Sequence, residues 1–272
     1  MCAVCGCSDD HHHHDPHPPH DHPPHDHGPH SQVHPAEGRA RSIVAIEQDI
    51  LAKNDRLAGD NRRWLLERQV FAVNFVSSPG AGKTTLLERT IRDLGGRLPI
   101  AVIEGDQATD RDARRIRAAG ARAVQINTGA GCHLDAAMVA RAIGDIEPVR
   151  ASLLAIENVG NLVCPALFDL GERLKVVVAS VTEGDDKPIK YPAMFRASDV
   201  AVLNKIDLLP YVEFDVAAFT ERVREINGRA RVFVLSATRG DGLTDFYSWL
   251  SAQVAGQATA ALEAKVTGAG LA

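Results

Sequence analysis

This chain is organised around the sequence Phe71-Ala-Val-Asn-Phe-Val-Ser-Ser-Pro-Gly-Ala-Gly-Lys-Thr-Thr-Leu-Leu87. An apolar run stops at small residues and then resumes with helical spacing, which is typical of the strand, phosphate loop and helix of a P-loop. Gly80 and Gly82 allow a tight turn whose N–H groups point at phosphate oxygens, and the helix beginning near Lys83 presents its positive end to the same charge. The sequence therefore predicts a nucleoside triphosphate site.

Two side chains of this loop have predicted roles. Lys83 is expected to reach the β- and γ-phosphates, and the Thr84 hydroxyl is expected to ligate Mg²⁺. Ser77 stands where the pattern G-x-x-x-x-G-K-S/T has its first glycine, and the alternative interpretation is a chance glycine-rich turn. The predicted nucleotide-binding residues of the loop are Ser78, Pro79, Gly80, Ala81, Gly82, Lys83, Thr84 and Thr85.

Composition excludes several classes of function. A net charge of −5 and a pI near 6.2 argue against a nucleic-acid-binding protein, which needs a basic surface. No apolar run approaches the roughly 18 residues that span a bilayer, and Met1 does not lead into a signal peptide, so we expect a cytoplasmic protein without membrane contact. Five cysteines in a reducing compartment indicate metal ligands or buried thiols.

The first residues place three thiols close together, at Cys2, Cys5 and Cys7. Thiolates this near to an α-amino group can bind one soft or borderline metal ion, and thiolate plus amine ligation suits square-planar Ni²⁺. Tetrahedral Zn²⁺ is the competing interpretation, and an oxidisable disordered tail is the alternative without a site.

The next segment is almost entirely His, Asp and Pro, a composition that cannot form a core. An expression tag is the alternative interpretation, but tags are uniform histidine runs, whereas these histidines are interspersed with Asp and Pro. We predict a disordered Cys/His-rich metal-binding segment at 1–38 and a weak nickel reservoir within it. The reservoir histidines are His11, His12, His13, His14, His17, His20, His22, His25, His27, His30 and His34.

Beyond this segment the pattern predicts helices at 39–69, a GTPase domain at 70–255 and a flexible tail at 256–272. Ile43, Ile46, Ile50 and Leu57 lie on one helical spacing, and Asp60 is predicted to cap a second short helix. In the domain, buried strands alternate with helices, which predicts an α/β fold with a mainly parallel sheet and helices on both faces. Ligands of such folds bind beyond the carboxyl ends of the strands. The predicted strands after the P-loop are Pro99–Glu104, Arg122–Ile126, Ser152–Glu157, Leu174–Val181, Asp199–Asn204 and Arg231–Leu235, and the predicted helices lie near 83–94, 109–119, 134–144, 215–226 and 243–254.

Two strand ends carry the residues of a guanine site. Asn204-Lys205-Ile-Asp207 follows one strand, and the Asp207 carboxylate can accept from both the ring N–H and the exocyclic amine of guanine, a donor pair that adenine lacks. Ser236-Ala237-Thr238 follows the last strand and resembles the supporting loop of GTPases. With the P-loop upstream, this combination predicts GTP as the nucleotide, and an ordinary polar turn is the alternative.

Acidic residues end two further strands. Glu157 is assigned to the Mg²⁺ shell and Asp106 to Mg²⁺ or to orientation of the attacking water, so that Asp106, Lys83 and Glu157 are the candidate catalytic residues. Gly160 resembles the glycine that senses the γ-phosphate. The alternative is that both carboxylates are solvated strand ends.

Outside the first 38 residues, the chain has one histidine and two cysteines, at Cys132, His133 and Cys164. If the strand order brings their loops together, these side chains meet near the triphosphate. Three ligands are too few for a closed tetrahedral site, so the fourth is water or comes from a second subunit. Buried structural thiols and a structural histidine are the alternative.

Together these motifs resemble the HypB family, GTPase accessory proteins that deliver nickel during maturation of nickel-iron hydrogenase. The resemblance covers nearly the whole chain, including the Cys2-x-x-Cys5-Gly-Cys7 start, the P-loop with Ser77, Glu104-Gly-Asp106, Cys132-His133, and Glu157-Asn-Val-Gly-Asn-Leu-Val-Cys164-Pro.

The resemblance implies a SIMIBI-class G domain that forms a homodimer when GTP is bound. It implies a tight N-terminal nickel site, and a second site at Cys132, His133 and Cys164 that binds nickel or zinc across the dimer interface. The implied partners are a HypA-type zinc protein and the hydrogenase large-subunit precursor. Lys187 resembles a family lysine that reaches the nucleotide of the partner subunit. No arginine finger stands out, so slow intrinsic hydrolysis of GTP is expected.

Three other interpretations remain open. A urease-type nickel GTPase shares the G domain but usually presents Cys-Pro-His, whereas here His133 follows Cys132 directly. A metal-storage protein with a vestigial G domain would not need Lys83, Thr84 and Asp207. A cobalamin-related chaperone GTPase would not need the thiol-rich start.

Overall fold

The structure is a computed structural model that describes residues 35–106, 110–129 and 131–268. The predicted ligands of the N-terminal segment, from Cys2 to His34, lie outside these residues. The chain divides into two units, Met1–Ile43 and Val44–Ala272. The sheet and both candidate sites lie in the second unit.

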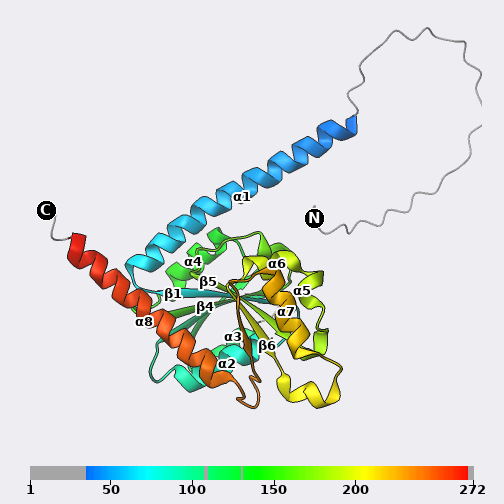
Figure 1. Ribbon diagram of the computed structural model, residues 1–272. Coiled ribbons are helices and arrows are strands. Elements are labelled where there is room, and N and C mark those ends of the chain that lie inside the picture. The colour runs from blue at the N-terminus through cyan, green and yellow to red at the C-terminus, as the bar shows by residue number, and fades with distance from the viewer. Residues whose placement is uncertain (1–34, 107–109, 130, 269–272) are drawn as a thin grey trace, which may run out of the picture. The chain divides into compact units, whose positions relative to one another are not determined.

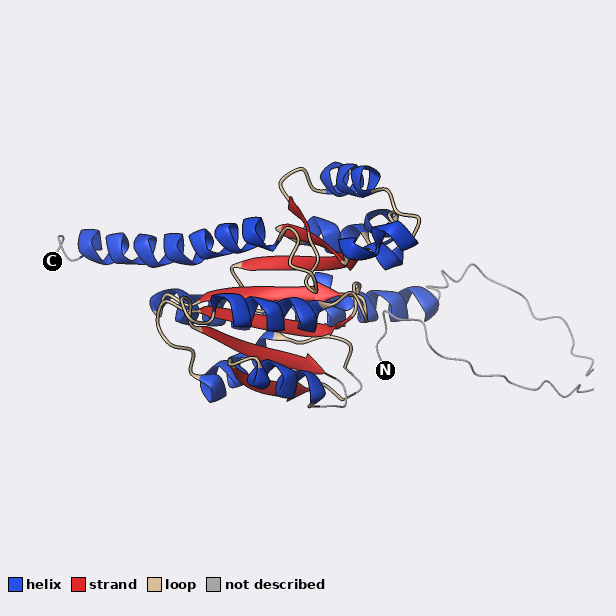
Figure 2. Cartoon of the chain, turned by 90° about the horizontal axis from the view of Figure 1, so that it is seen from below, coloured by secondary structure: helices blue, strands red, loops and turns tan. Residues whose placement is uncertain are grey.

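The second unit is built on a seven-stranded sheet in the order β3-β2-β4-β1-β5-β6-β7, and every neighbouring pair is parallel. Figure 2 shows the strands stacked with helices on both sides. The predicted parallel α/β sheet is therefore confirmed. Its strands are β1 (Phe71–Ser77), β2 (Ile100–Asp106), β3 (Arg122–Asn127), β4 (Leu153–Gly160), β5 (Leu174–Ser180), β6 (Val200–Asn204) and β7 (Arg231–Val234).

Helices lie in most of the connections between consecutive strands, as is usual for crossovers between parallel strands. The helices are α1 (Pro35–Glu67), α2 (Lys83–Leu94), α3 (Arg111–Ala118), α4 (Ala136–Ile146), α5 (Lys187–Lys190), α6 (Pro192–Ala197), α7 (Val216–Ile226) and α8 (Leu243–Gly268). Single 3-10 turns lie at Cys164–Ala166 and Val181–Glu183, and a longer 3-10 segment lies at Ile206–Tyr211.

Alternation along β1 shows how the two faces of the sheet are covered. Phe71, Val73 and Phe75 pack in a core with residues of α2, α3 and α8, whereas Ala72 packs with residues of α1 and α4 on the opposite face. Figure 1 shows the same division, with α2 and α8 on one side of the sheet and α4 on the other. Because side chains alternate between faces, consecutive strand residues reach different layers. Val76 completes the pattern in a third core with α6 and α7.

The prediction of two helices before β1 was wrong, because α1 is continuous through Asp60. The apolar face does not stop there, since Ala58 and Leu65, two turns apart, are both buried. The Asp60 carboxylate lies 3.4 Å from Arg63 one turn further along the same helix, so it does not act as a helix cap.

The predicted end of the last helix near residue 254 was also wrong, because α8 continues to Gly268. Its alanine-rich second half has high intrinsic helix propensity, which favours continuation of the helix beyond residue 254. The short helices α5 and α6 follow Asp186 and Tyr191, and each has proline at its first or second position. None of the described helices has the length and apolarity needed to cross a membrane.

Candidate nucleotide and metal sites

Two glycines of the P-loop, Gly80 and Gly82, have positive φ angles, and Gly82 has the tighter surroundings. Gly82 has φ +98° and precedes the first residue of α2, and a Cβ atom there would lie 2.5 Å from the Asn204 amide. Only glycine fits both this conformation and this close approach. The first N–H groups of α2 therefore face the cavity without a side chain in front of them.

Ser77, the departure from the usual glycine pattern, contacts the P-loop lysine directly. The Lys83 ammonium donates to the Ser77 hydroxyl at 2.8 Å, and that hydroxyl donates to the Ser78 carbonyl at 2.6 Å. Both side chains are buried at the carboxyl end of β1. The serine thus holds the lysine amine at the floor of the cavity, where phosphate oxygens would bind.

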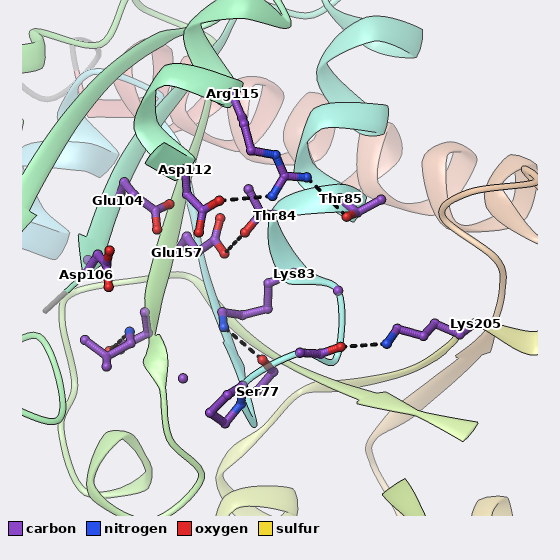
Figure 3. A pocket seen from close by; sticks show the side chains of 17 residues that line it. Ser77, Lys83, Thr84, Thr85, Glu104, Asp106, Asp112, Arg115, Glu157 and Lys205 are labelled. Carbon is purple, nitrogen blue, oxygen red and sulfur yellow. Dashed lines mark hydrogen bonds and ion pairs between the residues drawn. The ribbon is translucent and has the colours of Figure 1, made fainter. Parts of the chain in front are cut away.

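A cavity of about 550 Å³ lies over this loop and accommodates a triphosphate. Its wall comes from the P-loop, the ends of β2 and β4, the start of α3, and the Lys205 side chain, as Figure 3 shows. The predicted residues that line the cavity are Pro79, Gly80, Gly82, Lys83, Thr84, Thr85, Asp106, Glu157, Gly160 and Lys205. The predicted residues that do not line it are Ser78, Ala81, Asn204, Asp207, Ser236, Ala237, Thr238 and Lys187.

The predicted base-reading loop is bonded to the P-loop. The Asn204 amide donates to the Ala81 carbonyl at 3.0 Å and accepts from the Ala237 N–H at 3.0 Å. The Lys205 ammonium donates to the Gly80 carbonyl at 2.7 Å. Asn204 therefore links its own loop to the P-loop and to the segment that follows β7, which are far from it in sequence.

Asp207 is hydrogen-bonded to Ser236 in the loop that follows β7. The Ser236 hydroxyl donates to Asp207 Oδ1 at 2.6 Å, and the same oxygen of Ser236 accepts from the Arg239 N–H. The neighbouring Thr238 carbonyl accepts from Arg89 of α2 at 3.3 Å. Asp207 itself is half-buried.

Buried carboxylates gather beside the P-loop threonine. Thr84 donates to Glu157 Oε1 at 2.7 Å, and Glu157 is paired in register with Glu104 on the adjacent strand β2. Glu104 and Glu157 are only 2% and 3% exposed, and Figure 3 shows their carboxyl groups beside Thr84 together with that of Asp112. Burial raises the pKa of both glutamates, and the proximity of Glu157 raises the pKa of Glu104 further.

These carboxylates fit a hard divalent cation. One buried oxygen of Glu104 and one of Glu157 have no hydrogen-bond partner among the described residues. Carboxylate and hydroxyl oxygens are the ligands that Mg²⁺ prefers, and a bound cation would offset the cost of burying two like charges. The donor set at Thr84 is therefore suitable for Mg²⁺.

We expect that replacing Glu104 with glutamine stabilises the nucleotide-free protein at pH 8 by several kcal/mol, because each pH unit between the unfolded-state and folded-state pKa of Glu104 costs the wild type about 1.4 kcal/mol. The raised pKa means that the folded state holds a proton that the unfolded state releases above about pH 4.3, so the wild type loses stability as pH rises from that value. Thermal unfolding at pH 5 and pH 8 measures the effect, which should be small at pH 5. An equal change in stability at pH 5 and pH 8 would contradict the raised pKa of Glu104. Asp241→Asn, at an exposed loop carboxylate, is the control.

Sequence reasoning assigned no role to three charged residues that line this cavity, Glu104, Asp112 and Arg115. Glu104 lies two positions before Asp106, so the period of the strand places both on one face, and this signal was available. Asp112 and Arg115 enter from α3 and are bonded to each other at 3.0 Å. Arg115 also donates to Glu88 at 2.7 Å. Helical spacing links the α3 pair, but nothing local shows that α3 begins at the edge of the cavity.

The structure brings together the three internal metal-ligand candidates. Cys132 Sγ lies 2.9 Å from Cys164 Sγ and 3.6 Å from His133 Nδ1, and the three ligand atoms lie within 4.8 Å of one another. Burial lowers the pKa of His133, which packs on Phe168 at 3.9 Å between ring centroids, so the imidazole is neutral at pH 7. Two sulfurs and a neutral imidazole suit Ni²⁺ or Zn²⁺.

Helix α1 contacts both segments that carry the candidate metal ligands, a role that its sequence did not reveal. Asn54 accepts from the Ala136 N–H at 2.9 Å and donates to the Asp169 carbonyl at 2.7 Å. Asn61 donates to the Ala136 carbonyl and to the Leu170 carbonyl. The helix therefore joins the segment after His133 to the segment after Cys164.

Lys187 is engaged within its own subunit. Its ammonium donates to Glu183 at 2.6 Å, and the Glu183 carboxylate also accepts from the Ser180 N–H in a capping box. Lys187 is buried and does not border the cavity of this chain. Its predicted contact with a partner's nucleotide stays a prediction.

Comparison with known proteins agrees with this geometry. The family model described as CobW/HypB/UreG, nucleotide-binding domain, matches residues 71–234. Hydrogenase maturation factor HypB of Rhizobium leguminosarum bv. viciae is 57% identical over 216 residues, which cover 79% of this chain and 72% of that protein. Two crystal structures are similar at a TM-score of 0.70 each: HypB from Archaeoglobus fulgidus, 41% identical, covers 75% of this chain and 99% of its own, and HypB from Helicobacter pylori in complex with nickel, 39% identical, covers 74% and 95%. This chain therefore belongs to the HypB family of hydrogenase maturation factors, with the P-loop nucleotide-binding domain of the CobW/HypB/UreG proteins.

Proposed function

We propose that this protein is a GTP-hydrolysing nickel metallochaperone that delivers nickel to the hydrogenase large-subunit precursor. The observation that carries the proposal is the continuity of the two sites along one segment. Strand β4 supplies Glu157 and Gly160 to the nucleotide cavity, and the chain then reaches Cys164, whose sulfur lies 2.9 Å from that of Cys132. The crystal structure of the relative from Helicobacter pylori in complex with nickel supports nickel as the cargo.

In the proposed GTPase site, each residue acts on a defined part of the nucleotide. Asp207 accepts from the guanine base, and Lys83 binds the β- and γ-phosphates. Thr84, Glu157 and Asp106 hold Mg²⁺, which when bound supplies charge neutralisation at the phosphates. Asp106 also orients the attacking water, and Lys187 reaches the nucleotide of a second subunit.

In the proposed cycle, GTP binding changes the loop around Gly160 and drives homodimerisation, which places a second Cys132, His133 and Cys164 set near the first. Hydrolysis relaxes the loop and releases nickel. Zn²⁺ is the competing occupant of the same ligands. The N-terminal thiols and histidines form the tight nickel site and the reservoir.

The proposed partners follow from the cargo. Nickel is exchanged with a HypA-type accessory protein and is passed to the precursor in the cytoplasm, where thiols stay reduced. No nucleic-acid or membrane partner is proposed, because the chain is acidic and its described helices do not suit a bilayer.

The function is tested by titrating nickel into the full chain carrying serine at Cys2, Cys5 and Cys7, so that Cys132 and Cys164 are its remaining thiols. The thiolate-to-nickel charge-transfer absorption then reports the internal site alone. We expect the nickel affinity with a non-hydrolysable GTP analogue to differ from that with GDP by about 5–150-fold, the usual range of coupling between two sites. Sizing chromatography should show a dimer with the analogue. Equal nickel affinities in the two states would refute the coupling of nucleotide and metal.

A further inference from the structure

The nucleotide cavity and the thiol cluster are linked through two consecutive residues of β4. The side chain of Glu157 faces α2, where it accepts from Thr84. Because strand side chains alternate between faces, the next residue, Asn158, points to the opposite face, toward the segment that carries His133. A displacement of β4 at its carboxyl end therefore moves groups on both faces together.

Asn158 joins β4 directly to the metal-bearing segment. Its Oδ1 accepts from the Leu134 N–H at 3.1 Å, and Leu134 follows His133 in the chain. The same oxygen accepts from the Val159 N–H at 3.0 Å. Asn158 is 2% exposed, so these bonds are shielded from water and cannot be replaced by solvent.

The amide nitrogen of Asn158 extends the connection toward Cys164. It donates to Asn74 Oδ1 at 3.3 Å, and the Asn74 amide donates to Glu172 Oε1 at 3.1 Å. Glu172 lies 3.6 Å from the ammonium of Lys175.

Lys175 completes the connection on the other ligand segment. Its ammonium donates to the Pro165 carbonyl at 3.0 Å and to the Phe168 carbonyl at 3.2 Å. Pro165 follows Cys164, and Phe168 packs on His133. One buried polar network thus touches both segments that supply the metal ligands.

The nucleotide side of this network is in tight contact with the P-loop. A Cβ atom on Gly160 would lie 3.1–3.2 Å from Pro79, so the end of β4 packs closely against the phosphate loop. Binding of a γ-phosphate that shifts this contact would shift Asn158 as well.

We propose that Asn158 is a positioning residue that transmits the nucleotide state to the Cys132, His133 and Cys164 cluster. This inference rests on the proposed function, because it concerns the coupling of GTP to nickel. The Asn158 side chain holds Leu134 at a fixed place relative to β4. Through Asn74 and Glu172 it is also linked to Lys175, which binds the segment after Cys164. Breaking the first link removes the hydrogen bond that ties the segment after His133 to the end of β4, and leaves the apolar packing of Leu134 between that segment and the sheet.

The test compares the wild type with Asn158→Ala, both in the full chain carrying serine at positions 2, 5 and 7. Nickel is titrated at saturating GDP and at a saturating non-hydrolysable GTP analogue, and the ratio of the two affinities is recorded. We expect the ratio to fall from its wild-type value to within about threefold of one. If Asn158→Ala does not fold, Asn158→Ser takes its place, because its shorter side chain cannot reach Leu134.

The control is Asn227→Ala, which removes a side chain that donates to the carbonyls of Phe195, Arg196 and Ser198, away from both sites. This variant should lose stability and keep the wild-type ratio. A wild-type ratio of one would refute the proposed function. A wild-type ratio that differs from one and persists in the Asn158 variant would overturn the present inference alone.

Discussion

Nickel affinity at the internal cluster should fall at least about 100-fold when Cys164 is replaced with serine. A thiolate is a soft ligand, whereas a serine hydroxyl stays protonated and binds borderline metals poorly. Removing a residue that only hydrogen-bonds to a metal ligand typically lowers metal affinity 10–100-fold, so removing a ligand itself should lower it further. Cys164 is buried, and its sulfur lies 2.9 Å from Cys132 Sγ, so solvent cannot readily supply a substitute at the same position.

Competition with a chelator, followed by the thiolate-to-nickel charge-transfer absorption, measures this affinity in the full chain carrying serine at Cys2, Cys5 and Cys7, because the reservoir histidines do not contribute to that band. Val163→Ala is the matched control, because its exposed side chain precedes Cys164 and offers no metal ligand. GTP affinity should be unchanged in both variants, since neither residue lines the nucleotide cavity. Unchanged nickel affinity in the Cys164 variant would show that the cluster is structural and that nickel binds elsewhere.

Much of the fold could be predicted because the deciding signals are local. Continuous apolar strands such as β5 and β6 are buried on both faces, and their composition alone predicts a parallel sheet covered by helices. The P-loop could also be predicted from the sequence, because Gly80 and Gly82 act through their own backbone conformations.

Other features depended on contacts between distant segments. Asp60 looked like a helix cap, but the burial of Leu65 against the sheet carries α1 past it. Arg115 showed no local sign of bordering a cavity, because its place is set by the packing of α3 beside β2. The partners of Asn158 lie 24 and 84 residues away in the chain, so its role could not be predicted from spacing.

The close approach of Cys132 and Cys164 could be predicted only in part. The sequence indicated the ligand types, but their meeting depended on strand order. The cysteines follow β3 and β4, which are separated in the sheet by β2. A long loop before α4 carries Cys132 and His133 across β2, and the Asn158 bond to Leu134 fixes that loop against β4. The site is therefore a product of topology and of one buried amide.

Replacing Asp207 with asparagine should weaken GTP binding by roughly 10²–10⁴-fold and should favour xanthosine triphosphate instead. The carboxylate accepts from two donors of guanine, and hydrogen bonds to charged groups are worth about 1.5–3 kcal/mol each. In the asparagine variant a donor faces the exocyclic amine of guanine, whereas xanthine has a carbonyl oxygen at that place. The Ser236 hydroxyl, which donates to Asp207 Oδ1 at 2.6 Å, can still donate to the remaining oxygen, so the loop should keep its conformation.

Fluorescent-nucleotide displacement with both triphosphates measures this change of preference. Asp215→Asn is the control, because it also removes one negative charge after the same strand, but its carboxylate caps α7 through the Ala218 N–H. That variant should keep its preference for GTP. Equal loss of both nucleotides in the Asp207 variant would mean that the loop had collapsed, and unchanged GTP affinity would mean that Asp207 does not read the base. Because the Asn204 and Lys205 bonds to the P-loop do not involve the Asp207 side chain, the exchange of preference should occur without loss of phosphate binding.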